Sequence, residues 1–215
     1  MFSLGDAAMS ARSSLLRRRR LLQGLLLGSS TVLGGSLLST AALGWARPAE
    51  ALGGTLPELE EEAPPFDLPG VAGGKPVRLQ REDFRGRWLV LYFYPRDFTG
   101  GCTLEARGFQ RDLAAFRAAG AEVVGVSADG EEEHASFCES EGLAFPLLSD
   151  AGGAVSRAYG SWIAPFSQRH TFLIDPAGRM RARWVAVRPA GHSQEVLLTL
   201  QQLQAGASAP TGSAG

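Results

Sequence analysis

Hydrophobic residues follow two different periods along the middle of the chain, and these periods predict a strand followed by a helix. Residues 88–94 form a continuous apolar run that ends at Pro95, which is typical of a strand buried on both faces. Apolar side chains then recur at spacings of three and four, as on one face of a helix. They are Cys102, Ala106, Phe109, Leu113 and Phe116. Gly120 is expected to end this helix.

The same kinds of pattern continue towards the C-terminus. Strands are predicted over 123–126, 145–148, 171–174 and 180–186, and helices over 129–141, 151–159 and 196–203. The last strand alternates apolar residues with Arg181 and Arg183, so one of its faces is expected to meet water. The order β-α-β-α-β-α-β-β-α predicts an α/β fold, in which helices flank a central mixed β-sheet on both faces.

The flanking segments carry less pattern. Residues 52–75 are rich in Pro, Gly and Glu, which predicts an extended segment that leads into the domain. Residues 205–215 consist mainly of Gly, Ala, Ser and Pro, and they are expected to form a disordered tail. One compact domain is therefore expected over residues 64–204.

Composition agrees with one globular domain and limits its partners. Of the 215 residues, 45% are hydrophobic and 20% are charged, which excludes a fully disordered chain. Residues 1–51 hold six arginines and two acidic residues, which leaves 15 basic and 20 acidic residues in the rest, a net charge of −5. An acidic body disfavours nucleic acid as a partner. Two cysteines and three histidines make a poor zinc site, and neither a metal nor another cofactor is expected.

The N-terminus has the pattern of an export signal. Four arginines, Arg17–Arg20, precede an apolar stretch that begins at Leu21, and Ala49-Glu50-Ala51 offers small residues to a signal peptidase. Arg18-Arg19 followed by Leu21-Leu22 is also similar to a twin-arginine signal. Residues 1–51 are therefore expected to direct export, to a periplasm or a thylakoid lumen. The alternative is an uncleaved membrane anchor, because about 20 apolar residues can span a bilayer.

The candidate chemistry lies at the start of the predicted helix that contains Cys102. A thiol there meets the positive end of the helix dipole and free backbone N–H groups, and both favour the nucleophilic thiolate. Gly100 and Gly101 would let the backbone come close to whatever binds the sulfur. The alternative is a structural disulfide between Cys102 and Cys138, which are 36 residues apart in a chain expected to be exported.

At this point the sequence shows a family resemblance. Pro95-x-x-x-Thr99-x-x-Cys102 resembles the peroxidatic signature of the peroxiredoxins, and Tyr94–Asp112 is similar to their Q-type subgroup, also called bacterioferritin comigratory protein. Further matching blocks extend the resemblance over residues 64–204. They are 123–129, 145–150, 169–175 and Gly191-His192. The resemblance implies a thioredoxin-like fold and an antioxidant thiol peroxidase that reduces hydrogen peroxide and organic hydroperoxides.

The resemblance also implies roles for individual residues. Cys102 would be the peroxidatic cysteine, whose thiolate attacks the peroxide and becomes a sulfenic acid. Thr99 would hydrogen-bond the sulfur and the peroxide, while Arg169 would hold the thiolate and polarise the O–O bond. Pro95 would shield the sulfur from water. The peroxide would therefore contact Thr99, Gly101, Cys102 and Arg169.

One departure from the subgroup concerns the second cysteine. Many members carry it five residues after the first, where this chain has Arg107. A subset carries it on the later helix, which here holds Cys138. The resemblance therefore implies that Cys138 resolves the sulfenic acid through an intramolecular disulfide with Cys102, after the first helical turn around Cys102 unwinds. The alternative is a one-cysteine enzyme that an external thiol resolves.

Other polar residues receive no catalytic role from the sequence. Glu105 is either a partner for a nearby charged group or an ordinary acid in the first turn of the helix. The three histidines, His134, His170 and His192, are expected to be surface or structural residues. None is needed as a base, because the surroundings of the thiol can ionise it.

The leading hypothesis is a monomeric thiol peroxidase that thioredoxin or a similar dithiol protein recycles. One alternative is an exported thiol–disulfide oxidoreductase, but Thr99 stands where a C-x-x-C motif needs its first cysteine. Another alternative is a redox sensor or holdase that does not turn peroxide over. The membrane would become a partner if the N-terminal segment is retained.

Overall fold

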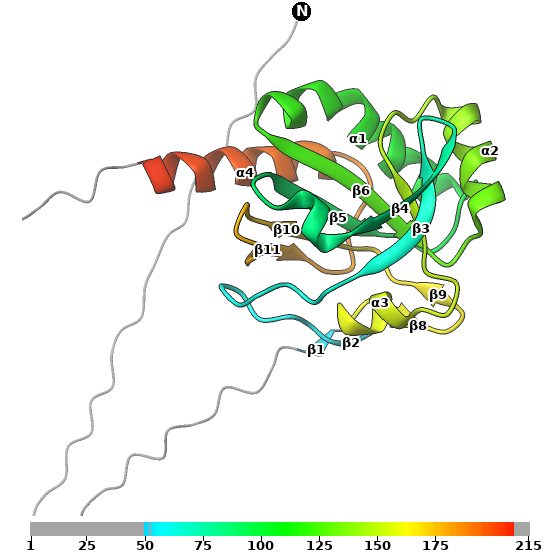
Figure 1. Ribbon diagram of the computed structural model, residues 1–215, viewed down its shortest axis with the longest axis horizontal. Helices are drawn as coiled ribbons and strands as arrows, with labels where there is room; N and C mark the ends of the chain where they lie inside the picture. The colour runs from blue at the N-terminus through cyan, green and yellow to red at the C-terminus, as the bar shows by residue number, and fades with distance from the viewer. Residues whose placement is uncertain (1–49, 52, 209–215) are drawn as a thin grey trace, which may run out of the picture. The chain divides into compact units, whose positions relative to one another are not determined.

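The computed structural model describes residues 50–51 and 53–208, which belong to one compact unit (Figure 1). Residues 1–49, which hold most of the predicted export segment, lie outside the described residues, as do residues 209–215 of the predicted tail. Within the described part of the chain, the helices are all too short or too polar to cross a membrane.

The centre of the fold is a seven-stranded mixed sheet. In spatial order its strands are β11 (Met180–Trp184), β10 (His170–Ile174), β5 (Trp88–Phe93), β6 (Ala121–Ser127), β7 (Leu147–Ser149), β3 (Asp67–Ala72) and β4 (Lys75–Gln80). β5, β6 and β7 run parallel, whereas the other neighbouring strands pair antiparallel. Two short hairpins lie outside this sheet. They are β1 (Glu50–Ala51) with β2 (Gly54–Thr55) and β8 (Trp162–Ile163) with β9 (Phe166–Ser167).

Helices cover both faces of the sheet, which confirms the predicted α/β architecture. The helices are α1 (Gly100–Ala118), α2 (Glu131–Glu141), α3 (Ala154–Ala158), α4 (His192–Ser208) and the short 3-10 helix η1 (Arg81–Phe84). Side chains of α1, α2 and α4 share one hydrophobic cluster, while Phe84 of η1 and Tyr159 at the end of α3 belong to the other. Figure 1 shows α1 and α4 on one side of the sheet and α3 on the other.

The central strand β5 explains why the continuous apolar run predicted a doubly buried strand. All six of its residues are buried. Val90 and Tyr92 face the cluster under α1, whereas Leu91 and Phe93 face the opposite cluster. Full burial of one such side chain contributes about 1.5–3 kcal/mol to the transfer free energy. The strand is therefore a rigid base for the loop that follows it.

The topology brings three chain segments to one edge of the sheet. β5 and β6 are parallel, so the loops that lead from them into α1 and α2 leave at the same edge. β10 is antiparallel to β5, and His170 at its start pairs with Phe93 at the end of β5. The first turns of α1 and α2 and the residue before β10 therefore meet at this edge.

The prediction for residues 52–75 as an extended lead-in was wrong for its last part, because β3 is an inner strand of the main sheet. β3 and β4 form a hairpin whose two-residue turn, Gly73-Gly74, has φ angles of 56° and 74°. Such a turn favours glycine at both positions and matches the twist of the strands. Prolines and glycines interrupt the apolar–polar alternation of this hairpin in the sequence, so the pattern did not predict its strands.

Several predicted helix boundaries also differ from the structure. α2 begins at Glu131 and not at Asp129, because the Asp129 carboxylate accepts hydrogen bonds from the Asp97 backbone N–H and the Ser127 hydroxyl. α3 begins after Gly153, whose φ is 67°. α4 extends from His192 to Ser208, so the predicted disordered tail begins too early.

Two predicted strands also have other limits. β11 ends at Trp184, since Ala186 adopts a φ of 51° that a strand does not continue through. β7 begins at Leu147 and extends to Ser149, whereas the apolar pattern predicted residues 145–148.

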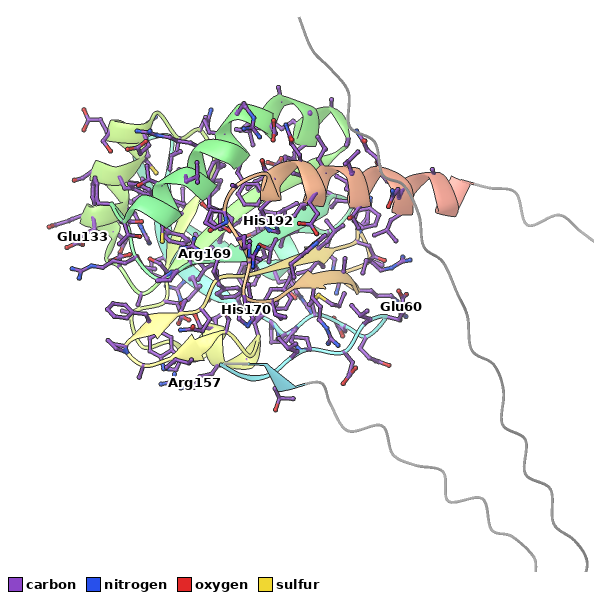
Figure 2. All side chains as sticks on the ribbon, turned by 180° about the vertical axis from the view of Figure 1, so that it is seen from behind. Glu60, Glu133, Arg157, Arg169, His170 and His192 are labelled. Carbon is purple, nitrogen blue, oxygen red and sulfur yellow. The ribbon has the colours of Figure 1, made fainter. Side chains whose placement is uncertain are left out.

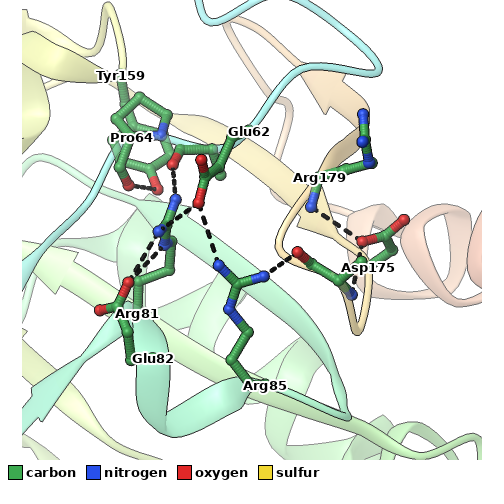
Figure 3. Close-up of polar contacts among 10 residues, drawn as sticks. Glu62, Pro64, Arg81, Glu82, Arg85, Tyr159, Asp175 and Arg179 are labelled. Carbon is green, nitrogen blue, oxygen red and sulfur yellow. Dashed lines mark hydrogen bonds and ion pairs between the residues drawn. The ribbon is translucent and has the colours of Figure 1, made fainter.

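The segment before β3, residues 56–66, covers the second face of the sheet, and two arginines bind it (Figure 3). Arg81 donates to the Ala63 carbonyl and to the Glu62 carboxylate, the latter at 2.7 Å. Arg85 donates to the same carboxylate at 3.1 Å, and the Tyr159 hydroxyl donates to the Pro64 carbonyl at 2.7 Å. Arg81 is buried, whereas the Glu62 and Arg85 side chains are exposed, so the contacts of Arg81 are the better shielded part of this attachment.

Candidate active site

Cys102 lies in the first turn of α1, at the sheet edge where β5 ends. Thr99 occupies the N-cap position, so the helix begins two residues before the cysteine and not at it. The thiol is 1% exposed. Backbone N–H groups in the first turn of a helix have no partner within the helix, and their partial positive charge favours an anion there. The helix start predicted from the sequence is therefore confirmed within two residues.

Arg169, labelled in Figure 2, is the residue before β10. It reaches the Cys102 sulfur. Its Nη2 donates a hydrogen bond to Cys102 Sγ at 3.2 Å, and its Nη1 donates to Glu105 Oε2 in an ion pair. A guanidinium is always charged, and its planar fork can hold two partners at once. The structure thus places a fixed positive charge beside a buried sulfur, as the resemblance implied.

Gly101 allows the close approach of the guanidinium. A Cβ at this position would lie 3.1 Å from Arg169 Nη2, which is closer than ordinary van der Waals contact. At Gly100 the same added atom would meet open space. Of the two glycines that the sequence singled out, Gly101 is the one at which an added side chain would crowd Arg169.

Glu105 is a buried member of the site, and the sequence had left its role open. Its side chain is 1% exposed and lies one turn after Cys102 on α1. Burial raises the pKa of this carboxyl from 4.5 to about 7, although the Arg169 guanidinium opposes the shift. Its Oε1 has no hydrogen-bond partner in the described structure. Around neutral pH, Glu105 therefore changes between a neutral and a charged partner of Arg169.

We expect this carboxyl to make the stability of the protein depend on pH. The folded protein holds the Glu105 proton up to about pH 7, whereas the unfolded chain releases it near 4.5. Between these values the folded state binds more protons, so the contribution to the unfolding free energy is complete below about pH 4.5 and is lost as the pH rises through about 7. The loss is about 3 kcal/mol at most.

Urea unfolding at several pH values, with Glu105→Gln as the comparison, measures this effect. The variant cannot titrate at this position, so its unfolding free energy should fall less between about pH 5 and about pH 8. Parallel pH profiles for the two proteins would contradict the assignment.

Thr99 does not make the contact that the resemblance implied. Its hydroxyl donates to the Arg96 carbonyl at 3.0 Å, and the side chain is exposed, so the expected hydrogen bond to the sulfur is absent in the described structure. The hydroxyl closes the turn that leads into α1, a local contact that such side chains often make. Pro95 is partly buried two residues after the end of β5, and its role in shielding the sulfur from water stays a prediction.

Cys138 lies on α2 and is also a buried free thiol. Burial, followed by the nearby Asp97 carboxylate, raises its pKa from 9.0 to about 11. The residue lines an open groove of about 480 Å³ together with Gly73 and Gly74 of the β3–β4 turn. The raised pKa favours the protonated thiol at neutral pH, and a more polar setting for Cys138 would favour its nucleophilic thiolate.

The three histidines are all buried, which agrees with the structural alternative of the prediction and excludes the surface alternative. His134 Nδ1 is 2.7 Å from Asp97 Oδ2. His192 Nε2 is 2.8 Å from the Thr171 hydroxyl, and neither ring nitrogen of His170 has a partner in the described structure. Within residues 50–51 and 53–208, no cluster of His, Cys, Asp and Glu could hold a metal ion.

Comparison with known proteins points to the same chemistry. Residues 59–183 match the AhpC/TSA family. The chain is 41% identical to Peroxiredoxin Bcp of Xanthomonas campestris over 153 residues, which cover 66% of this chain and 94% of that protein. It is 36% identical to Peroxiredoxin Bcp of Bacillus subtilis over 154 residues, which cover 68% of this chain and 96% of that protein.

A solved structure shares both fold and sequence with this chain. The bacterioferritin comigratory protein of Xanthomonas campestris, studied for its alkyl peroxide reduction activity, superposes with a TM-score of 0.59 at 36% identity. The superposition covers 64% of this chain and 91% of that protein. The resemblance to the Q-type peroxiredoxins and the thioredoxin-like fold are therefore confirmed.

Proposed function

This chain belongs to the peroxiredoxins of the AhpC/TSA family and is a thiol peroxidase, and from this premise we propose that Cys102 is its peroxidatic cysteine. The observation that carries the proposal is the hydrogen bond of 3.2 Å between Arg169 Nη2 and the buried Cys102 Sγ. A thiolate held by a fixed positive charge is ready to attack without a separate base.

The proposed substrates are hydrogen peroxide and organic hydroperoxides. The Cys102 thiolate attacks the terminal peroxide oxygen, the S–O bond forms and the O–O bond breaks. Cysteine becomes a sulfenic acid, and the other oxygen leaves as hydroxide or alkoxide and takes up a proton. Arg169 stabilises the negative charge that grows on the leaving oxygen. The alkyl peroxide reduction activity of the Xanthomonas campestris relative supports organic hydroperoxides as substrates.

We propose that Cys138 resolves the sulfenic acid. Its thiolate attacks the Cys102 sulfur, the S–S bond forms, the S–O bond breaks, and the oxygen leaves as water with the thiol proton. Two solved variants of Xanthomonas campestris peroxiredoxin Q replace cysteines by serine at positions 36 residues apart, which is the separation of Cys102 and Cys138. This agreement supports the same pair as the reacting cysteines of this chain.

We propose thioredoxin, or a similar dithiol protein, as the reductant. It supplies the two electrons that return the Cys102–Cys138 disulfide to two thiols and becomes a disulfide itself. The test follows peroxide consumption by the full-length chain with thioredoxin, thioredoxin reductase and NADPH, beside Cys138→Ser. The parent should sustain turnover, whereas Cys138→Ser should consume one equivalent and then stop.

Two results would contradict parts of this proposal. Sustained turnover by Cys138→Ser at the rate of the parent would mean that an external thiol resolves the sulfenic acid. If the parent fails to consume peroxide and keeps a Cys102–Cys138 disulfide in the presence of thioredoxin, the cysteines form a structural pair and the site is not peroxidatic.

A further inference from the structure

A buried polar network surrounds Asp97, two residues after Pro95. The Tyr94 hydroxyl donates to Asp97 Oδ1 at 2.7 Å, and His134 Nδ1 lies 2.7 Å from Asp97 Oδ2. The Asp97 backbone N–H donates to the Asp129 carboxylate at 2.8 Å. Tyr94, Asp97 and His134 are 4% exposed or less. A buried carboxylate with both oxygens and its own N–H engaged is held firmly in place.

The network joins the two segments that carry the cysteines. Asp97 belongs to the loop that leads into α1, five residues before Cys102, whereas His134 lies on α2, one helical turn before Cys138. A second contact runs beside the first, because the Phe98 and Phe137 rings meet edge to face with centroids 5.1 Å apart. The loop is thus fastened to α2 through two successive residues.

The loop is also held in an unfavourable backbone conformation. Phe98 has a φ of 58°, although it is not a glycine, and its large ring is 56% exposed. Such a conformation persists where surrounding contacts impose it. The contacts of Asp97 on one side and of Phe137 on the other supply that constraint. When they open, the loop is free to move to an ordinary conformation.

The two sulfurs have different surroundings while these contacts are closed. Cys102 Sγ accepts a hydrogen bond from Arg169, whereas Cys138 lines the groove beside the β3–β4 turn, and both are free thiols. The two cysteines are free thiols in this arrangement, so a disulfide between them requires one or both of their segments to move. We expect the first turn of α1, the turn of α2 around Cys138, or both, to unwind in that movement. Unwinding α1 displaces the loop of Asp97, and unwinding α2 displaces His134. Either movement separates Asp97 from His134 and so weakens the hydrogen bond between them.

We propose that Asp97 and His134 are positioning residues that hold the loop before Cys102 against the helix of Cys138, and that their hydrogen bond opens when the disulfide forms. This inference rests on the proposed function of the two cysteines. The bond keeps the reduced protein in the arrangement that meets peroxide, and it restrains the rearrangement that follows. Its loss should therefore leave the peroxide step largely intact and accelerate the resolving step.

The test measures the two steps separately in the full-length chain by stopped-flow tryptophan fluorescence. In His134→Phe, which lacks the Nδ1 donor, we expect the first-order rate of disulfide formation to rise about tenfold, equivalent to about 1.4 kcal/mol. The second-order rate with hydrogen peroxide should stay within about threefold of the parent. A merely structural role of His134 would not shift the two rates differently.

Two matched variants sharpen the result. His134→Asn keeps a donor near the Nδ1 position and should return disulfide formation towards the parent rate. Tyr94→Phe removes a hydrogen bond from the same carboxylate without cutting its link to α2, and its effect should be clearly smaller than that of His134→Phe. If His134→Phe does not fold, His134→Gln replaces it, because its amide reaches the Nε2 position but not the Nδ1 position.

The proposal is overturned if disulfide formation in His134→Phe is as slow as in the parent, or slower, or if Tyr94→Phe accelerates it equally. Failure of the proposed function looks different. In that case the parent itself forms no Cys102–Cys138 disulfide after one equivalent of peroxide, and non-reducing peptide mapping shows this before any variant is compared.

Discussion

Cys102→Ser is expected to abolish peroxide reduction. A serine hydroxyl at this position remains protonated and lacks the nucleophilicity of a thiolate, so the second-order rate constant should fall roughly 10⁴- to 10⁶-fold, to the uncatalysed background. The change replaces one atom at a site that is 1% exposed, and it should leave the fold intact. Direct loss of hydrogen peroxide, followed at equal protein concentration, measures the effect.

Cys138→Ser is the matched control for this variant. It makes the same substitution on a second buried cysteine, and it should still consume peroxide in a single turnover. A Cys102→Ser protein that still reduced peroxide at a rate near that of the parent would move the chemistry to another residue. Equal loss of the single turnover in both variants would instead indicate a common structural defect.

Arg169→Lys is expected to lower the same rate constant roughly 10²- to 10³-fold, the usual effect of removing one fixed donor from a developing anion. The guanidinium donates to the Cys102 sulfur through Nη2 and to Glu105 through Nη1. A lysine ammonium is a single point of charge and cannot hold both partners in this planar arrangement. The side chain keeps its positive charge, so the experiment tests geometry and not charge alone.

Arg107→Lys provides the comparison within the same helix. Arg107 is an exposed arginine of α1 that forms an ion pair with Glu141, away from the sulfur. Its replacement should change the rate with hydrogen peroxide less than about twofold, because exposed ion pairs contribute little. Equal effects of the two substitutions would mean that Arg169 acts through the stability of the fold.

The sequence predicted the strands and helices whose burial pattern is local. β5 and α1 appear directly in the spacing of apolar residues, because the strand is buried on both faces and the helix on one. The β3–β4 hairpin escaped prediction since the edge strand β4 exposes most of its side chains and β3 contains Pro69 and Gly70. Its burial depends on pairing with β7, a contact between residues far apart in sequence.

The candidate site was predictable only in part. Cys102 and Arg169 followed from a motif resemblance, and their contact is present. The burial of Glu105 depends on Arg169, 64 residues later, and that of His134 depends on Asp97. No local pattern signals such pairs, because a carboxylate or an imidazole in a helix looks the same in sequence whether it faces water or a distant partner. The Thr99 hydroxyl donates to the Arg96 carbonyl in its own loop, because that carbonyl lies close by, and the motif resemblance did not predict this local contact.

If Cys102 is the peroxidatic cysteine, its burial also selects among oxidants by size. Thiol–disulfide exchange lines up the attacking thiolate, the attacked sulfur and the leaving sulfur, so the whole disulfide needs open space in front of the reacting thiolate. A hydroperoxide presents a two-atom end that can reach a recessed sulfur. With Cys102 at 1% exposure, a bulky oxidised thiol meets a closed surface at this sulfur. In that role, Cys102 would stay available to the small oxidant and would be spared mixed disulfides with larger molecules.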